Sequence, residues 1–245
     1  MYYHNDWAVV VPLANEEREF QSFIDQMTLV LDKLESGRVY LVVDTVSVDH
    51  TYELCQSISK CDPRYVTVWS PNNKNVVDAY RSGFSAALKN NHKYIIEMDA
   101  GLSHDPRAIP MFLRVLNEGN DCAFGSRYIN GGSMSDSPIN RRFLSKAGTI
   151  LANTLLGTTM KDMTSGYQGF SSEILHKLLR AKLLSKAHFY QTEVRYLLRR
   201  QRYMEVPIHY SAPSPRVSKG AVLNSFVVLA YYLWQRITFR APMII

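Results

Sequence analysis

The sequence predicts an α/β domain in which helices flank a mostly parallel β-sheet. A length of 245 residues suits one domain, with or without an appendage. Apolar residues make up 46% and charged residues 20%, a globular balance that argues against disordered, collagen-like and coiled-coil chains. Over the first 130 residues, short apolar runs alternate with segments of helical periodicity, which is typical of a parallel sheet covered on both faces.

Each element of this alternation can be assigned from its length and period. Five short apolar runs fit buried strands: Trp7–Val11, Val39–Val43, Tyr65–Trp69, Tyr94–Met98 and Cys122–Phe124. Helical patterns lie between them at Glu16–Leu34, Thr51–Ser59, Val76–Leu88 and Ala108–Leu116. The second half is less regular, with helices expected at Arg141–Leu156, Phe189–Arg200 and Val222–Arg236, a strand at Tyr203–Tyr210, and turns or loops at Asn130–Ser137, Thr164–Phe170 and Pro213–Lys219.

Polar residues follow four of the predicted strands. These segments are Pro12–Glu17, Asp44–Asp49, Asp99–Asp105 and Gly125–Tyr128. Ligands of parallel sheets bind beyond the carboxyl ends of the strands, so the four loops predict one shared site. Helix capping by Asp, Asn or Ser explains any single loop equally well, but it explains all four together less well.

The charge is divided unevenly between the two halves. Residues 1–120 carry 11 basic and 16 acidic side chains, a net charge of −5, and residues 121–245 carry 17 and 6, a net charge of +11. A basic second half indicates a polyanionic partner, namely phosphate groups, an anionic membrane surface or nucleic acid, unless it is simply a solvated basic face. Nucleic acid is disfavoured because the basic residues are dispersed and no nucleic-acid motif contains them.

The sequence contains few features that indicate the cellular compartment of the protein. Cys55, Cys61 and Cys122 form no CxxC pair, which argues against a zinc site or disulfide framework and favours a reducing compartment. The first residues lack the layout of a signal peptide. The longest uninterrupted apolar run is Phe226–Trp234, well short of the roughly 20 residues that span a bilayer. We therefore expect a cytoplasmic protein, peripheral to the cytoplasmic face of a membrane.

The strand-end segments resemble a known family in sequence and in order. VVVPLANEE, VVDTVSVDHT and MDAGLSHDP resemble the first three conserved blocks of family 2 glycosyltransferases with the GT-A fold. GSRY, the NRR segment at Asn140–Arg142, DMTSGYQGF and RVSKG resemble later blocks of its polyprenol-phosphate sugar synthases, such as the dolichol-phosphate mannose synthases. The resemblance implies an inverting transfer of a sugar from a GDP- or UDP-linked donor to a polyprenyl phosphate of the dolichyl or undecaprenyl type.

Two positions depart from the family pattern. Thr45 stands where the second-strand motif has a second acid, and Asp99-Ala100-Gly101 stands where the DxD motif has a second aspartate. The resemblance implies that this missing acid is a ligand of Mg²⁺ or Mn²⁺, which leaves Asp99 as the motif's one metal-binding carboxylate. Weak metal binding shared with the donor's phosphates, replacement of the metal by cationic side chains, and loss of catalysis are all open.

The donor candidates come from the loops after the first, second and fourth strands. Carboxylates accept hydrogen bonds from base N–H and ribose O–H groups, which makes Glu17 and Asp44 candidates. For Glu17 the alternative is an acid favoured by the helix dipole in the first turn. The predicted donor-binding residues are Pro12, Leu13, Asn15, Glu17, Asp44, Asp99, Ala100 and Gly101.

The acceptor candidates come from the basic second half. A phosphate monoester has its second pKa at about 6 and is already nucleophilic at neutral pH, so it needs a cationic cradle rather than a strong base. The predicted acceptor or phosphate-binding residues are Ser126, Arg127, Arg141, Arg216 and Lys219, and the predicted catalytic residues are Asp99, Arg127 and Asp162. Arg142 also fits this cationic cradle, but a position on the charged surface explains it equally well. A turn or capping residue explains Asp162 equally well.

Two alternatives and one appendage complete the prediction. Transfer to a sugar hydroxyl of a growing glycan would need a catalytic carboxylate, for which Asp162 and Glu193 are the candidates. For Glu193 the alternative is a helix-surface acid paired with Lys186 or Arg200. A catalytically silent nucleotide-sugar-binding paralogue is the second alternative. Residues 1–220 are expected to form the GT-A domain and residues 221–245 an amphipathic helix that meets a membrane, a core or a second subunit.

Overall fold

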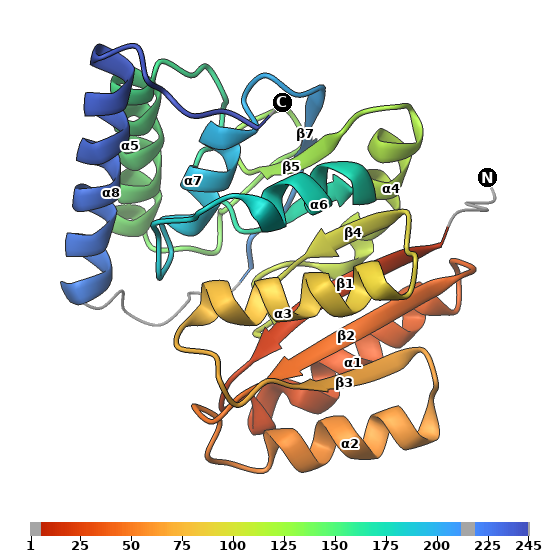
Figure 1. Ribbon diagram of the computed structural model, residues 1–245. Coiled ribbons are helices and arrows are strands. Elements are labelled where there is room, and N and C mark those ends of the chain that lie inside the picture. Colours follow the sequence, from red (N-terminus) through yellow and green to blue (C-terminus); the bar gives the residue numbers. More distant parts are fainter. Residues whose placement is uncertain (1–5, 212–218, 245) are drawn as a thin grey trace.

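The computed structural model describes residues 6–211 and 219–244. Its described residues form one seven-stranded sheet in the order β3-β2-β1-β4-β6-β5-β7, with helices on both faces (Figure 1). The strands are β1 Trp7–Leu13, β2 Gly37–Val43, β3 Tyr65–Trp69, β4 Tyr94–Glu97, β5 Cys122–Ser126, β6 Gln168–Ser171 and β7 Tyr203–Pro207. All neighbours pair in parallel except β6, which is antiparallel to β4 and β5.

The predicted α/β class and the five N-terminal strands are confirmed, as are the four helices between them. These helices are α1 Glu17–Leu31, α2 Thr51–Cys61, α3 Val76–Lys89 and α4 Ile109–Asn117, the last preceded by the 3₁₀ turn Pro106–Ala108. Alternating β1 side chains enter different cores, because Ala8 and Val10 pack with α3 while Val9 and Val11 pack with α1 and α4. The sheet is thus buried on both faces, as its apolar strands indicate.

The segment Thr164–Phe170, predicted as a turn, was wrongly assigned in its last residues. Gln168–Ser171 is β6, which lies between β4 and β5 in the middle of the sheet. Its four residues contain no β-branched side chain, so pairing on both edges rather than propensity makes the strand. Gly169 leaves room for Phe112 and Leu116, each 3.3 Å from where a Cβ would stand. The helix that follows, α6 Ser172–Arg180, was not predicted.

The remaining helices cover one end of the sheet. They are α5 Ile139–Leu156, α7 Tyr190–Leu197 and α8 Lys219–Ile237, and α5 and α8 lie side by side in Figure 1. Tyr232 on α8 donates a hydrogen bond to buried Glu193 on α7, and Arg236 donates to the carbonyl oxygens of Thr154 and Leu155 on α5. The C-terminal helix is therefore packed against the rest of the domain.

The amphipathic character expected of the last helix is not confirmed. Val228, Leu229 and Tyr232 are buried, but exposed positions of α8 are apolar as well, among them Phe226 and Trp234. Within the described residues, no helix combines the length and apolarity needed to cross a membrane. The predicted strand Tyr203–Tyr210 ends at Pro207, beyond which His209 and Tyr210 form only isolated bridges.

Candidate active site

The loops after β1 and β2 are joined by hydrogen bonds at the carboxyl edge of the sheet. Asn15, in the left-handed region at φ 59°, donates from its side chain to the Val46 carbonyl and accepts from the Val48 N–H. Pro12 and Leu13, predicted to follow the strand, are its last two residues and pair with β2. These two donor-binding candidates therefore belong to the sheet and not to the loop that follows it.

Asp44 follows β2 directly and is mostly buried. Its Oδ1 accepts the N–H of Val46 at 2.9 Å, so the carboxylate caps its own turn. Asp105 likewise accepts the N–H of Arg107 and starts the 3₁₀ turn, which agrees with helix capping as the alternative explanation of this loop. Capping engages Asp44 Oδ1 and fixes the side chain at the end of β2, which is compatible with a binding role.

The two acids after β1 have different surroundings. Glu17 is exposed, and its carboxylate accepts the N–H of His50 and lies 3.1 Å from the His50 ring nitrogen Nδ1. Glu16 is half-buried, and its Oε2 is 3.8 Å from where a Cβ on Gly101 would stand. Burial, followed by the nearby Glu19 and Asp99 carboxylates, raises the pKa of Glu16. Glu16 therefore faces Gly101 of the Asp99 motif, whereas Glu17, the predicted donor-binding residue, lies beside His50.

Asp99 follows β4 and is held from two sides. The Tyr80 hydroxyl donates to Asp99 Oδ1 over 3.0 Å, and the Asp99 N–H donates to His104 Nδ1 over 3.1 Å. His104 is buried and stacked on Tyr167, with ring centroids 4.9 Å apart, and burial lowers its pKa. The Asp99 side chain is still 44% exposed, so it is oriented by the protein yet open to a ligand.

Arg127 and Asp162 form a buried ion pair at the end of β5. Arg127 Nε donates to Asp162 Oδ2 over 2.7 Å and Nη2 donates to Oδ1 over 2.9 Å, while the Arg127 N–H also donates to Oδ2. Burial alone would raise the pKa of Asp162, but the hydrogen bonds and charge of Arg127 bring it to about 2. Asp162 therefore orients Arg127 and is a poor general base at neutral pH.

A second buried arginine holds this loop in place. Arg195 on α7 donates to the carbonyl oxygens of Asp162, Gly125 and Ser165, at 2.6, 3.0 and 3.0 Å. It thereby ties the Asp162 loop to the end of β5. Sequence reasoning missed Arg195, because nothing in the helical pattern distinguishes it from the surface arginines around it.

Glu193 was considered both as a catalytic acid and as a surface acid, and the structure supports neither. Its oxygens accept the N–H groups of Leu184 and Ser185 and the hydroxyl of Tyr232. The residue is fully buried. The predicted pairing with Lys186 or Arg200 was wrong, because Glu193 satisfies backbone donors and anchors α8. With Asp162 paired as well, neither candidate carboxylate for a sugar-hydroxyl acceptor is placed as a base.

The other cationic candidates are brought together in part. The guanidinium carbons of Arg127 and Arg141 lie 5.6 and 5.9 Å from the ring centroid of Tyr210, on the same aromatic side chain. Ser126 is fully buried inside the fold rather than open to a phosphate, because it is the last residue of a central strand. Arg216 lies outside the described residues, and Lys219 is described only as the first residue of α8.

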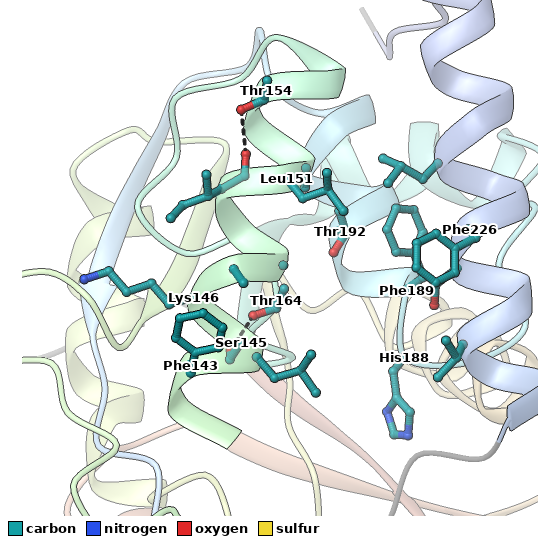
Figure 2. A pocket seen from close by; sticks show the side chains of 18 residues that line it. Phe143, Ser145, Lys146, Leu151, Thr154, Thr164, His188, Phe189, Thr192 and Phe226 are labelled. Atoms are coloured by element: carbon teal, nitrogen blue, oxygen red, sulfur yellow. Dashed lines mark hydrogen bonds between the residues drawn. The ribbon is translucent and has the colours of Figure 1, made fainter. Parts of the chain in front are cut away.

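An apolar cavity of about 1060 Å³ lies between α5 and α8 (Figure 2). Phe143, Leu151, Phe189 and Phe226 are among the side chains that line it. Thr164 also lines it, and Thr164 Oγ1 accepts a 2.7 Å hydrogen bond from Arg127 Nη2. One residue of the cavity lining is therefore hydrogen-bonded to the buried arginine. No sequence signal indicated a cavity, since its two walls are helices about 80 residues apart.

Comparison with known families decides the class of protein. The family model described as "Glycosyl transferase family 2" matches residues 8–179. This chain belongs to glycosyl transferase family 2. The resemblance noted in the sequence is thereby confirmed, and the chain is a glycosyltransferase.

Two curated relatives and a solved structure extend this assignment. The glycosyltransferase is 30% identical to the polyprenol monophosphomannose synthase of Mycolicibacterium smegmatis over 88% of this chain and 81% of that protein. It is 28% identical to the undecaprenyl-phosphate mannosyltransferase of Micrococcus luteus, over 89% of this chain and 90% of that protein. The Mycobacterium tuberculosis glucosyl-3-phosphoglycerate synthase, solved with Mn²⁺ and UDP, matches with a TM-score of 0.62 and 18% identity over 98% of this chain and 81% of that one. This last match supports the GT-A-like fold.

The Asp99 motif offers few protein ligands for a divalent cation. Within residues 6–211 and 219–244, no group of three or more His, Cys, Asp or Glu side chains is placed to hold a metal ion. The Glu16 carboxylate lies beside Gly101, and the charge of Asp99, two residues before that glycine, contributes to the raised pKa of Glu16. Mg²⁺ is commonly held by one or two carboxylates together with substrate phosphates, so this oxygen donor set fits a metal bound with a nucleotide.

Proposed function

We propose that this glycosyltransferase transfers a sugar from a nucleoside diphosphate to a polyprenyl phosphate, with inversion at the anomeric carbon. The observation that supports it most strongly is the apolar cavity, whose lining residue Thr164 accepts a hydrogen bond from buried Arg127. A polyprenyl phosphate combines a long apolar chain with an anionic head, and this pairing of apolar walls with a buried guanidinium matches both parts. The names of the two curated relatives agree with such an acceptor.

On the donor side, we propose that the nucleotide sugar lies along the carboxyl ends of β1, β2 and β4. Asp44 would accept hydrogen bonds from the base or ribose, and Asp99 would face the diphosphate. Glu17, exposed at the same edge of the sheet beside His50, is kept as a second acceptor for the base or ribose. The remaining residues proposed for this slot are Pro12, Leu13, Asn15, Ala100 and Gly101.

On the acceptor side, Arg127 and Arg141 would position the phosphate for direct attack. The phosphate is ionised at neutral pH, so it attacks without a general base, in agreement with the low pKa of Asp162. Asp162 and Arg195 position Arg127 rather than react. Single displacement inverts the anomeric configuration. A bound Mg²⁺ or Mn²⁺ would neutralise charge on the departing diphosphate.

We further propose that the face formed by α5 and α8 rests on the cytoplasmic surface of a membrane. Phe143 on α5 and Phe226 on α8 are 75% and 58% exposed, although both line the cavity. Other exposed apolar side chains on the two helices are Ile139, Leu144, Ile150, Leu223, Val227, Trp234 and Ile237. In this arrangement residues 1–220 carry the transfer chemistry and residues 221–245 complete the membrane-facing surface, which lets the acceptor chain enter from the bilayer.

The proposal is tested by acceptor competition. Purified protein is first screened against GDP- and UDP-sugars, since a ligand that binds the native state raises its apparent stability. Transfer to a long polyprenyl phosphate is then measured with increasing short-chain polyprenyl phosphate or the matching free alcohol. We expect inhibition by the phosphate and little by the alcohol. Equal inhibition by both, or transfer to a free sugar hydroxyl instead, would reject the lipid phosphate as acceptor.

A further inference from the structure

We propose that Glu16 replaces the second acid missing from the Asp99 motif, so that Glu16 and Asp99 together hold the divalent cation of the donor site. The inference rests on the proposed use of a nucleoside-diphosphate donor. It assigns the metal to a pair of carboxylates contributed by two different strand-end loops, instead of to two acids within one motif.

Strand pairing brings the two loops together. β1 and β4 are parallel neighbours, with Val10 opposite Glu97, so the segments that follow them leave the same edge of the sheet side by side. Glu16 lies three residues beyond the end of β1, and Asp99 lies two residues beyond the end of β4. Residues far apart in the sequence therefore share one short stretch of the edge.

The position of Gly101 provides the strongest geometric evidence. A Cβ at residue 101 would meet one heavy atom within 4 Å outside its chain neighbours, and that atom is Glu16 Oε2, at 3.8 Å. An aspartate at residue 101 would direct its carboxylate into the region next to this Cβ. The Glu16 carboxylate thus already occupies the surroundings in which the motif's second acid would act.

The charges around the pair favour a cation between them. Among the described residues, the ion pairs include no lysine or arginine on Asp99 or Glu16. His104 lies 3.7 Å from Asp99 Oδ2, but its Nδ1 accepts the Asp99 N–H and so carries no proton toward that oxygen. The Tyr80 hydroxyl donates to Oδ1 and holds Asp99 in orientation. Like-charged carboxylates on neighbouring loops repel each other, and a bound divalent cation removes that cost.

The test measures metal binding directly and uses a rescue variant. Mn²⁺ is titrated by electron paramagnetic resonance into the full chain with saturating GDP or UDP, whichever stabilises the protein. Four proteins are compared with the wild type: Glu16→Gln, Gly101→Asp, the double variant, and Glu19→Gln. The last is a matched control, because Glu19 is exposed on α1 and also contributes to the raised pKa of Glu16. Circular dichroism confirms that each variant is folded.

We expect Glu16→Gln to weaken Mn²⁺ affinity at least 10-fold, since loss of even an outer-shell partner costs about 10- to 100-fold. Gly101→Asp in the Glu16→Gln background should restore most of that affinity, and Glu19→Gln should bind as the wild type does. Should Glu16→Gln fail to fold, Glu16→Asp, which withdraws the carboxylate by one methylene, is measured in its place with the same expected loss.

Two results would overturn the inference. One is Mn²⁺ affinity that is unchanged in Glu16→Gln, and the other is a folded double variant that recovers none of it. Nucleotide that binds the wild type equally well in EDTA and in Mn²⁺ would also overturn it, while leaving the proposed donor intact. Failure of the wild type to bind either nucleotide under any condition would instead reject the proposed function itself.

Discussion

Arg127 and Thr164 join the polar and apolar parts of the candidate acceptor site. Arg127 Nη2 donates to Thr164 Oγ1 over 2.7 Å, and Thr164 lines the apolar cavity between α5 and α8. The same guanidinium donates two hydrogen bonds to the Asp162 carboxylate, one to each oxygen. A charged group is thus hydrogen-bonded to a residue of the apolar cavity lining, which is the arrangement from which the acceptor was inferred.

Arg141 and Arg142 provide a matched pair for testing the phosphate cradle. Arg141 is half-buried and its Nη2 lies 3.5 Å from the Tyr210 hydroxyl, whereas Arg142 is exposed. We expect Arg141→Ala to raise the KM for polyprenyl phosphate about 10-fold or more, because a hydrogen bond to a charged group contributes about 1.5–3 kcal/mol. Steady-state kinetics should show little change for Arg142→Ala. Equal effects of the two variants would mean that general surface charge, not a cradle, attracts the acceptor.

Removal of the Asp162 charge should destabilise the fold. Asp162→Asn leaves Arg127 as a buried cation without its carboxylate, a change that costs about 3–5 kcal/mol in comparable buried pairs. Chemical denaturation at pH 7 measures this loss. Asp136→Asn is the control, since Asp136 is exposed and pairs with the half-exposed His209. A variant as stable as the wild type would show that the pair contributes nothing to folding.

The same pair predicts an acid limb in the stability profile. The pKa of Asp162 is about 2 in the folded protein and 3.8 when unperturbed, so the folded state favours the ionised carboxylate. Its stabilisation is present above pH 3.8 and is lost as the pH falls toward 2. In Asp162→Asn this contribution should disappear and the unfolding free energy should depend less on pH in that window. Parallel profiles for the two proteins would contradict the assignment.

Glu97 predicts the opposite trend at higher pH. Glu97 is the fully buried last residue of β4, and it accepts hydrogen bonds from Gln168 and Tyr190. Burial raises its pKa from 4.5 to about 8. Between these two values the unfolded chain releases a proton that the folded protein keeps, so stability should fall as the pH rises from about 4.5 to 8. Denaturation at several pH values should give a flatter profile for Glu97→Gln. An unchanged slope would show that Glu97 is ionised in the fold.

The apolar cavity can be tested by varying the acceptor chain. Phe226→Glu places a charge on the cavity wall, and we expect the KM for long-chain polyprenyl phosphate to rise about 10-fold, because burial of an aromatic side chain contributes about 1.5–3 kcal/mol. A short-chain acceptor should be affected less. Leu29→Glu is the control, since Leu29 is an exposed apolar residue on α1, over the other face of the sheet. The same effect on both chain lengths would place the tail elsewhere.

The parallel half of the fold could be predicted because its signals are local. Apolar runs and helical periods alternate from β1 to β5. The strands β1, β2, β4 and β5 are almost entirely buried, while the edge strand β3 is only partly buried. β6 could not be found in this way, because Gln168–Ser171 becomes a strand only through pairing with β4 and β5. The site residues divide in the same way, into those that local sequence signals predict and those that depend on tertiary contacts. Asp44, Asp99 and Arg127 could be placed from their strands, since they follow or end one directly.

The partners of these residues depend on tertiary contacts that the sequence does not show. Two adjacent glutamates follow β1, and only their packing shows that Glu16 faces Gly101 while Glu17 faces His50. Arg195 and Glu193 belong to one helical pattern, yet both are buried and serve backbone groups of neighbouring loops. A pattern of charges can therefore suggest that an acid or base has a role, but the backbone groups it meets decide which role.

Transfer of a labelled sugar to matched acceptors tests the central claim most directly. The donor is the GDP- or UDP-sugar that stabilises the protein, and the acceptors are a polyprenyl phosphate and its free alcohol of equal length in the same vesicles. The account predicts labelled lipid from the phosphate alone, with the anomeric configuration of the donor inverted when the product is examined by NMR. Labelled product from the alcohol, or a retained configuration, would contradict it.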